Sequence, residues 1–166
     1  VVPDRTRAHW FVLSPTAAGL ADLKIRVEAC LRAGADAAGC SLDLDWLAPA
    51  YDELVPNAAL ADAWADNLAR VGRRSVRPGE AGTRAVVGST DMGNVSQRVP
   101  AIHPMVAVAP PGVAIHTEAF VGYAGGPEGD RAVLDAAKAM ATTVVDLWTD
   151  AALGDRVRAE FEARDG

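Results

Sequence analysis

The chain has 166 residues, half of them apolar, and its 16 basic and 22 acidic side chains leave a formal net charge of −6. High apolar content and modest net charge argue against intrinsic disorder, and the acidic balance argues against a general nucleic-acid-binding protein. No apolar run reaches the roughly 18 residues that a membrane span needs.

The first 47 residues read as strand, helix, strand. Residues 5–13 alternate and then become wholly apolar, which is typical of a strand. Ser14 and Pro15 favour a helix start, and apolar residues at spacings of three and four predict an amphipathic helix that Gly39 ends. Residues 41–46 alternate again. This βαβ unit is half of a ferredoxin-like sandwich, and it leaves a sheet edge and a sheet face in need of partners.

The cysteines indicate the cellular compartment of the protein, and the first residues indicate that the chain is part of a longer polypeptide. Cys30 and Cys40 fit no zinc-ribbon or redox spacing, so we expect two buried, reduced thiols in a cytosolic protein. No signal-peptide pattern is present, and residues 1–4 resemble the end of a loop that enters a strand. We therefore expect a fragment or a processed chain with polypeptide missing upstream.

The second part of the chain begins after an irregular link around residues 47–56. Asn57 is predicted to cap a helix that ends at Gly72, and Asp150 to start the last helix. Short strands are predicted at residues 84–87 and 105–109, each followed by a polar loop. A long helix from Gly126 is predicted to bury a stripe made of Val133, Ala137, Met140, Val144 and Trp148.

The two polar loops are the candidate site, because ligands of open α/β sheets gather beyond the carboxyl ends of strands. Residues 88–96 hold a carboxylate, an amide and hydroxyls, which can bind a ligand, orient a metal-bound histidine or satisfy a turn. In the second loop, His116 can be a metal ligand, a general base or a structural residue. A metal site needs at least three protein ligands. His9 and His103 share no motif with His116, so a self-contained histidine site is not expected.

Three segments together carry a resemblance: STDMGNVS at residues 89–96, VPAIHP at 99–104 and HTE at 116–118. They resemble the C-terminal half of the aminoacylase-like metallopeptidases, in the branch of p-aminobenzoyl-glutamate hydrolase subunits and β-alanyl-dipeptide peptidase. Weaker matches extend the resemblance over nearly the whole chain. The resemblance implies an α/β fold in two parts. Residues 1–47 would form the βαβ half of a ferredoxin-like lid and dimerisation domain, and residues 48–166 the C-terminal part of a zinc-peptidase-like catalytic domain.

The resemblance also implies a reaction. His116 matches the last metal-binding histidine of the family, while the general base and the other ligands belong upstream, so no catalytic residue is expected in this chain. One or two divalent cations, zinc or else manganese or cobalt, would activate a water that hydrolyses the amide bond of a dipeptide or small N-acyl amino acid. Thr90, Asp91 and Asn94 are candidates to orient His116 or to contact substrate. Leu13 stands where relatives often carry a carboxylate-binding arginine, which puts acidic-tailed substrates in doubt.

The resemblance further implies a homodimer that needs the missing upstream half, and the reduced cysteines predict a cytoplasmic location. Two alternatives stay open: a non-catalytic α/β dimerisation or interaction module that pairs by strand addition, and a small acidic domain of another family. An enzyme piece would place His116 beside Asp91 at a cleft. A binding module would bury or isolate His116 and expose apolar surface along the first 47 residues. We expect the chain alone to bind divalent metal poorly and to have negligible amidase activity.

Overall fold

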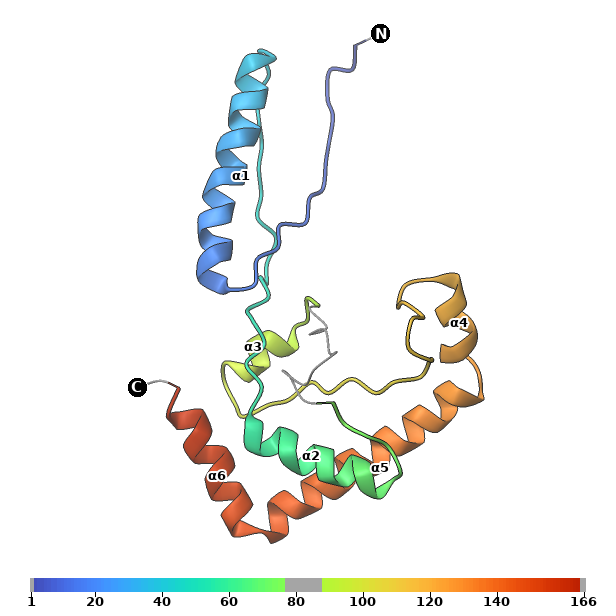
Figure 1. Cartoon of the computed structure of the whole chain (residues 1–166). Helices are drawn as coiled ribbons and strands as arrows, with labels where there is room; N and C mark the ends of the chain where they lie inside the picture. The colour runs from blue at the N-terminus through green and yellow to red at the C-terminus, as the bar shows by residue number, and fades with distance from the viewer. Residues whose placement is uncertain (1, 77–87, 165–166) are drawn as a thin grey trace. The chain divides into compact units, whose positions relative to one another are not determined.

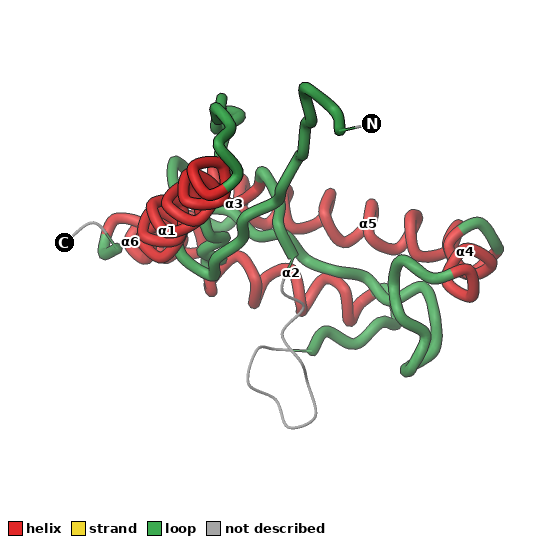
Figure 2. Tube along the Cα trace, turned by 90° about the horizontal axis from the view of Figure 1, so that it is seen from above, coloured by secondary structure: helices red, strands yellow, loops and turns green. Residues whose placement is uncertain are grey.

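The computed structural model describes residues 2–76 and 88–164, and this part of the chain contains helices and no strand (Figures 1 and 2). The predicted α/β class, with a βαβ lid half followed by an α/β catalytic part, is therefore wrong for the described chain. The helices are α1 (Ala17–Ala37), α2 (Ala58–Arg70), α3 (Met92–Ser96), α4 (Glu118–Ala124), α5 (Pro127–Thr149) and α6 (Ala151–Glu162).

The predicted strands fail because they have no partners. Residues 5–13, 41–46 and 105–109 run as long connecting segments (Figure 1), and none of the backbone–backbone hydrogen bonds of the described residues involves them. The predicted strand at 84–87 lies outside the described residues. Alternation of apolar and polar side chains indicates that the two sides of a segment differ in polarity. A strand also needs a neighbouring strand that completes its backbone hydrogen bonds.

The described chain divides into two compact units. Unit 1 comprises residues 2–54 and 88–94, and unit 2 comprises residues 55–76 and 95–164. No helix among these residues is long and apolar enough to cross a membrane.

Unit 1 is built around α1. Thr16, rather than the predicted Ser14, caps this helix by accepting a hydrogen bond from the Gly19 amide at 3.1 Å. Gly39 follows the helix with φ of 66°, a left-handed conformation that glycine adopts cheaply, as predicted. No residue of α1 is buried. Cys30 and Cys40 are both exposed, so their predicted burial is wrong. Cys30 lies on α1, where no residue is buried, and Cys40 follows the helix.

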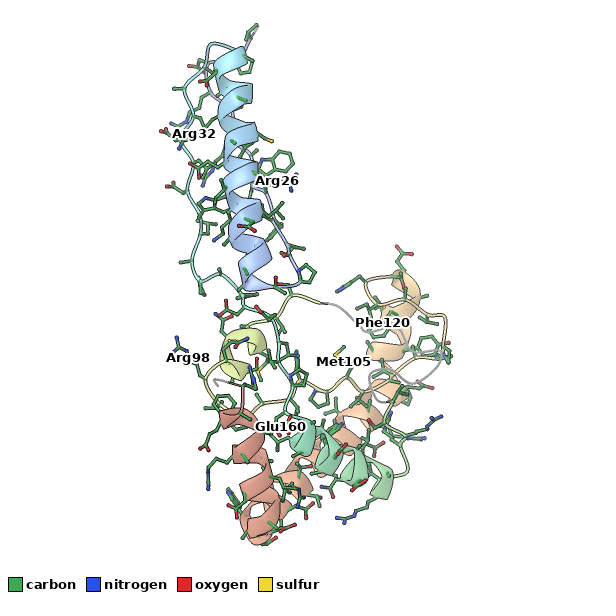
Figure 3. All side chains as sticks on the ribbon, turned by 60° about the vertical axis from the view of Figure 1, so that its left-hand side comes forward. Arg26, Arg32, Arg98, Met105, Phe120 and Glu160 are labelled. Carbon is green, nitrogen blue, oxygen red and sulfur yellow. The ribbon has the colours of Figure 1, made fainter. Side chains whose placement is uncertain are left out.

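Unit 2 contains the hydrophobic core, where α2 packs against α5 and α6. Asn57 caps α2 as predicted: its Oδ1 accepts from the Leu60 amide at 3.0 Å. Its Nδ2 donates to the Val157 carbonyl on α6, also at 3.0 Å. Glu160 of α6 accepts hydrogen bonds from the first two amides of α2 (Figure 3). The buried core residues are Leu60, Trp64, Leu68, Ala101, Ala132, Ala139, Leu153 and Val157.

Helix α5 starts at Pro127 as expected, but it buries a different face from the one predicted. Its buried residues are small: Gly129, Ala132, Ala139 and Thr143. Small side chains let α2 approach closely, and Asn67 of α2 donates to Thr143 Oγ1 at 3.1 Å. The predicted stripe is uncovered, because periodicity identifies an apolar face without saying which neighbouring face meets another helix. Its residues Val133, Ala137, Met140, Val144 and Trp148 are all exposed.

Candidate functional site

The first candidate loop contains α3, a short helix that the sequence analysis missed. Thr90 forms the turn before this helix: its carbonyl accepts from the Gly93 amide at 3.2 Å, and its Oγ1 accepts from the Met92 amide at 3.3 Å. The same hydroxyl lies 3.5 Å from Asp91 Oδ1, to which it donates. Asp91 is exposed. Thr90 therefore organises the turn, while the Asp91 carboxylate faces solvent.

Asn94 is engaged with the backbone of residues 50–52. Its Oδ1 accepts from the Asp52 amide at 2.9 Å, and its Nδ2 donates to the Ala50 carbonyl at 2.9 Å. The carboxamide thus replaces the hydrogen-bonding partner that a neighbouring strand would offer. Gly93 allows this approach, since a Cβ at that position would lie 1.9 Å from the Asp52 carbonyl oxygen. Within unit 1, Gly93 and Asn94 hold the segment before residue 54 against α3.

His116 sits in a turn directly before α4. It is exposed and has φ of 64°, a left-handed conformation that costs a non-glycine residue about 1–2 kcal/mol. Thr117 stabilises the turn, because its Oγ1 donates to the Ala114 carbonyl at 2.7 Å and accepts from the Phe120 amide at 3.4 Å. No hydrogen bond or ion pair of the described residues involves the imidazole. Both ring nitrogens of His116 are therefore open to a ligand.

The described residues do not form a complete metal site. Across residues 2–76 and 88–164, no group of three or more histidine, cysteine, aspartate or glutamate side chains could hold a metal ion. Since a protein metal site needs at least three ligands, His116 can contribute one bond and no more. His116 belongs to unit 2, whereas Thr90, Asp91 and Asn94 belong to unit 1. The predicted pairing of His116 with Asp91 stays a prediction.

Unit 2 also contains a cavity that the sequence analysis did not single out. It has a volume of about 340 Å³ and is lined by side chains of both signs together with residues 107–110. Arg73 lines it but is already engaged: its Nε donates to Asp135 Oδ2 at 2.7 Å and its Nη1 to the Ala107 carbonyl at 2.8 Å. Arg73 therefore ties α5 to the segment at Ala107. Glu128 and Arg131 are the other charged residues of the lining.

Over almost its whole length, the chain is similar to dipeptidases. It is 32% identical over 164 residues to the Xaa-Arg dipeptidase of Mus musculus, a match that covers 99% of this chain and 38% of that protein. It is 30% identical over 164 residues to the Xaa-Arg dipeptidase of Homo sapiens, covering 99% of this chain and 37% of that protein. The chain thus spans little more than a third of the length of these curated relatives. No protein-family model matches it.

These similarities confirm a relationship to dipeptidases. They do not identify the p-aminobenzoyl-glutamate or β-alanyl-dipeptide branch.

Proposed function

We propose that this chain is part of a dipeptidase, and that His116 is one ligand of the divalent cation used by the complete enzyme. The observation that carries the proposal is the 32% identity over 164 residues with the mouse dipeptidase. The reaction would be hydrolysis of the amide bond of a dipeptide, or more widely of a small N-acyl amino acid. Because the relatives are named for dipeptides that end in arginine, such dipeptides are the first substrates to assay.

The position of His116 supports its role as a ligand. A neutral imidazole is the commonest side-chain metal ligand and suits zinc, and this ring is exposed with both nitrogens open. Residues held in a left-handed conformation at some energetic cost cluster at binding and active sites. Thr117 maintains that conformation through its hydrogen bonds to Ala114 and Phe120. Because the described residues form no complete ligand set, the proposal places the other ligands outside them.

A zinc titration followed by calorimetry tests the assignment of His116. The 166-residue chain alone is expected to show no tight, stoichiometric zinc binding. The decisive comparison uses a chimera in which this chain replaces the matching 164 residues of the mouse dipeptidase. In that chimera, His116→Ala should remove bound metal and dipeptide hydrolysis. The control His103→Ala changes another exposed histidine and should preserve both. Equal metal content and activity in the two variants would contradict the proposed role.

A second candidate function, association through unit 1, is supported by the exposed apolar surface there. Trp10, Phe11 and Leu13 are 66%, 84% and 67% exposed. They line a groove of about 460 Å³ with Leu23 and Val27 of α1. A homodimer that pairs through this groove is compatible with the dipeptidase proposal. Analytical ultracentrifugation tests self-association through this groove. Phe11→Asp should abolish self-association, whereas Val2→Asp, at an exposed apolar position outside the groove, should not.

A further inference from the structure

The cavity of unit 2 is formed by α4, the first turns of α5 and the chain on either side of them. Its volume of about 340 Å³ lies within the range of roughly 300–1,000 Å³ that is typical of small-molecule sites. All of its lining residues belong to unit 2. They are Arg73, residues 107–110, Tyr123, Glu128 and Arg131.

One wall of the cavity is held in place by Arg73. Its guanidinium donates to Asp135 of α5 at 2.7 Å and to the Ala107 carbonyl at 2.8 Å. The Arg73 and Asp135 side chains are only 21% and 15% exposed, so this ion pair is well shielded from water. Because Asp135 balances the charge of Arg73, this wall is electrically neutral. It is also formed without a ligand, which lowers the ordering cost of binding one.

Two opposite charges in the lining are not paired with each other. Glu128 and Arg131 are three residues apart on α5, and side chains at that spacing are neighbours on a helix surface. Among residues 2–76 and 88–164, no hydrogen bond or ion pair engages the Glu128 carboxylate, the Arg131 guanidinium or the Tyr123 hydroxyl. The cavity therefore offers one anion, one cation and one hydroxyl to a ligand.

The chemistry of the lining specifies the ligand. A guanidinium binds a carboxylate through two parallel hydrogen bonds, and a carboxylate accepts from an ammonium group. A free α-amino acid carries both groups on one carbon, so it can bridge Arg131 and Glu128. A second cation on its side chain would meet no further carboxylate in the lining, while Val108, Ala109 and Pro110 offer apolar contacts. These features favour an amino acid with an aliphatic side chain.

We propose that the cavity of unit 2 binds a free α-amino acid with an uncharged, aliphatic side chain. Arg131 contacts its carboxylate, Glu128 contacts its ammonium group, and residues 108–110 contact its side chain. Burial of that side chain supplies the apolar contribution to binding. Binding does not depend on the proposed function, although hydrolysis of a dipeptide would release ligands of this class.

An NMR titration of the isotope-labelled 166-residue chain with L-leucine tests the proposal. The backbone amides of Val108, Ala109 and Arg131 should shift and reach saturation. N-acetyl-L-leucine lacks the ammonium group, and L-leucinamide lacks the carboxylate. Each should bind at least about tenfold more weakly than leucine, because each loses one charge-assisted contact.

Variants of the two charged lining residues test which groups hold the ligand. Glu128→Gln and Arg131→Gln should each weaken leucine binding at least about tenfold. Glu162→Gln and Arg156→Gln make the same changes at exposed positions of α6 outside the lining, and they should weaken it by less than about twofold. The spectrum of each variant before leucine is added shows whether its fold is intact.

Four results would overturn the proposal. The first is the absence of a saturable shift of these amides up to the solubility limit of leucine. The second is equal affinity for leucine and its two derivatives, and the third is an equal effect of the lining and control variants. The fourth is tighter binding of L-alanyl-L-leucine than of leucine, which would assign the cavity to a dipeptide. None of these readouts depends on metal or hydrolysis, so failure here is distinguishable from failure of the dipeptidase proposal.

Discussion

Gly93 and Asn94 secure the segment at residues 50–54 by two different means. Asn94 forms hydrogen bonds with the backbone of Ala50 and Asp52. Gly93 has no side chain and therefore leaves room for the close approach of this backbone. The sequence analysis assigned Asn94 to substrate or to His116 because a polar residue in a loop after an apolar segment is typical of binding sites. Asn94 lies on α3 and contacts this backbone, and no local pattern could indicate a partner 42 residues away. Its role toward substrate or His116 stays a prediction.

Gly93→Ala is expected to destabilise unit 1 by about 1–3 kcal/mol, because the new methyl group would collide with the Asp52 carbonyl and the backbone cannot move aside freely. Urea unfolding followed by circular dichroism measures the change. Gly88→Ala is the matched control, since no atom lies within 4 Å of a Cβ built there. A similar midpoint for both variants would show that the close approach of α3 to residue 52 is incorrect.

The stability of unit 1 depends on pH through the carboxyl group of Glu53. Hydrogen bonds from its own backbone amide and from the Ala17 amide, the latter at 2.8 Å, hold the pKa of the Glu53 carboxyl below its ordinary value of 4.5. Because the folded pKa is the lower one, this contact stabilises unit 1 fully above pH 4.5 and is lost as the pH falls through the folded pKa. An NMR titration should place the Glu53 midpoint below 4.5. In Glu53→Gln, the Ala17 amide should lose its response to pH in that range; a midpoint at or above 4.5 would contradict the contact.

At the scale of the elements, the helix ends were the most predictable features. The predicted caps Asn57 and Asp150 accept from the amides of Leu60 and Leu153, because capping depends on a side chain and a backbone group three residues apart. The short helices α3 and α4 were missed, since neither is long enough to display an apolar period.

The buried face of α5 leads to a direct test at this scale. Ala139 is completely buried against the core cluster of Trp64 and Leu68, whereas Ala137 of the predicted stripe is exposed. Ala139→Leu is expected to cost about 1–3 kcal/mol of unfolding free energy through overpacking. Ala137→Leu should change it by no more than about 0.5 kcal/mol. Thermal unfolding of the two variants measures the difference. A larger cost for Ala137→Leu than for Ala139→Leu would mean that α5 buries the face that the sequence analysis predicted.

At the scale of the whole molecule, burial is unequal between the units. Every buried apolar residue of the described chain belongs to unit 2, while α1 of unit 1 has none. Since local opening is cheapest where few apolar contacts must break, the central amides of α1 should exchange at least about tenfold faster than those of α2 and α5. Hydrogen exchange followed by mass spectrometry measures these rates. Equal protection of α1 and α2 would mean that α1 is covered in solution.

The sequence by itself determined the long helices, the caps of α2 and α6, the glycine that follows α1 and the relationship to dipeptidases, because each of these depends on neighbouring residues or on residue identity. Only the tertiary structure decided that the extended segments remain unpaired, that α5 buries its small residues, and that Asn94 holds residues 50–52. The physical reason is the same in each case. Strand pairing, the choice of a buried face and the partner of a side chain depend on groups distant in the chain, and local patterns carry no information about which of those groups are present.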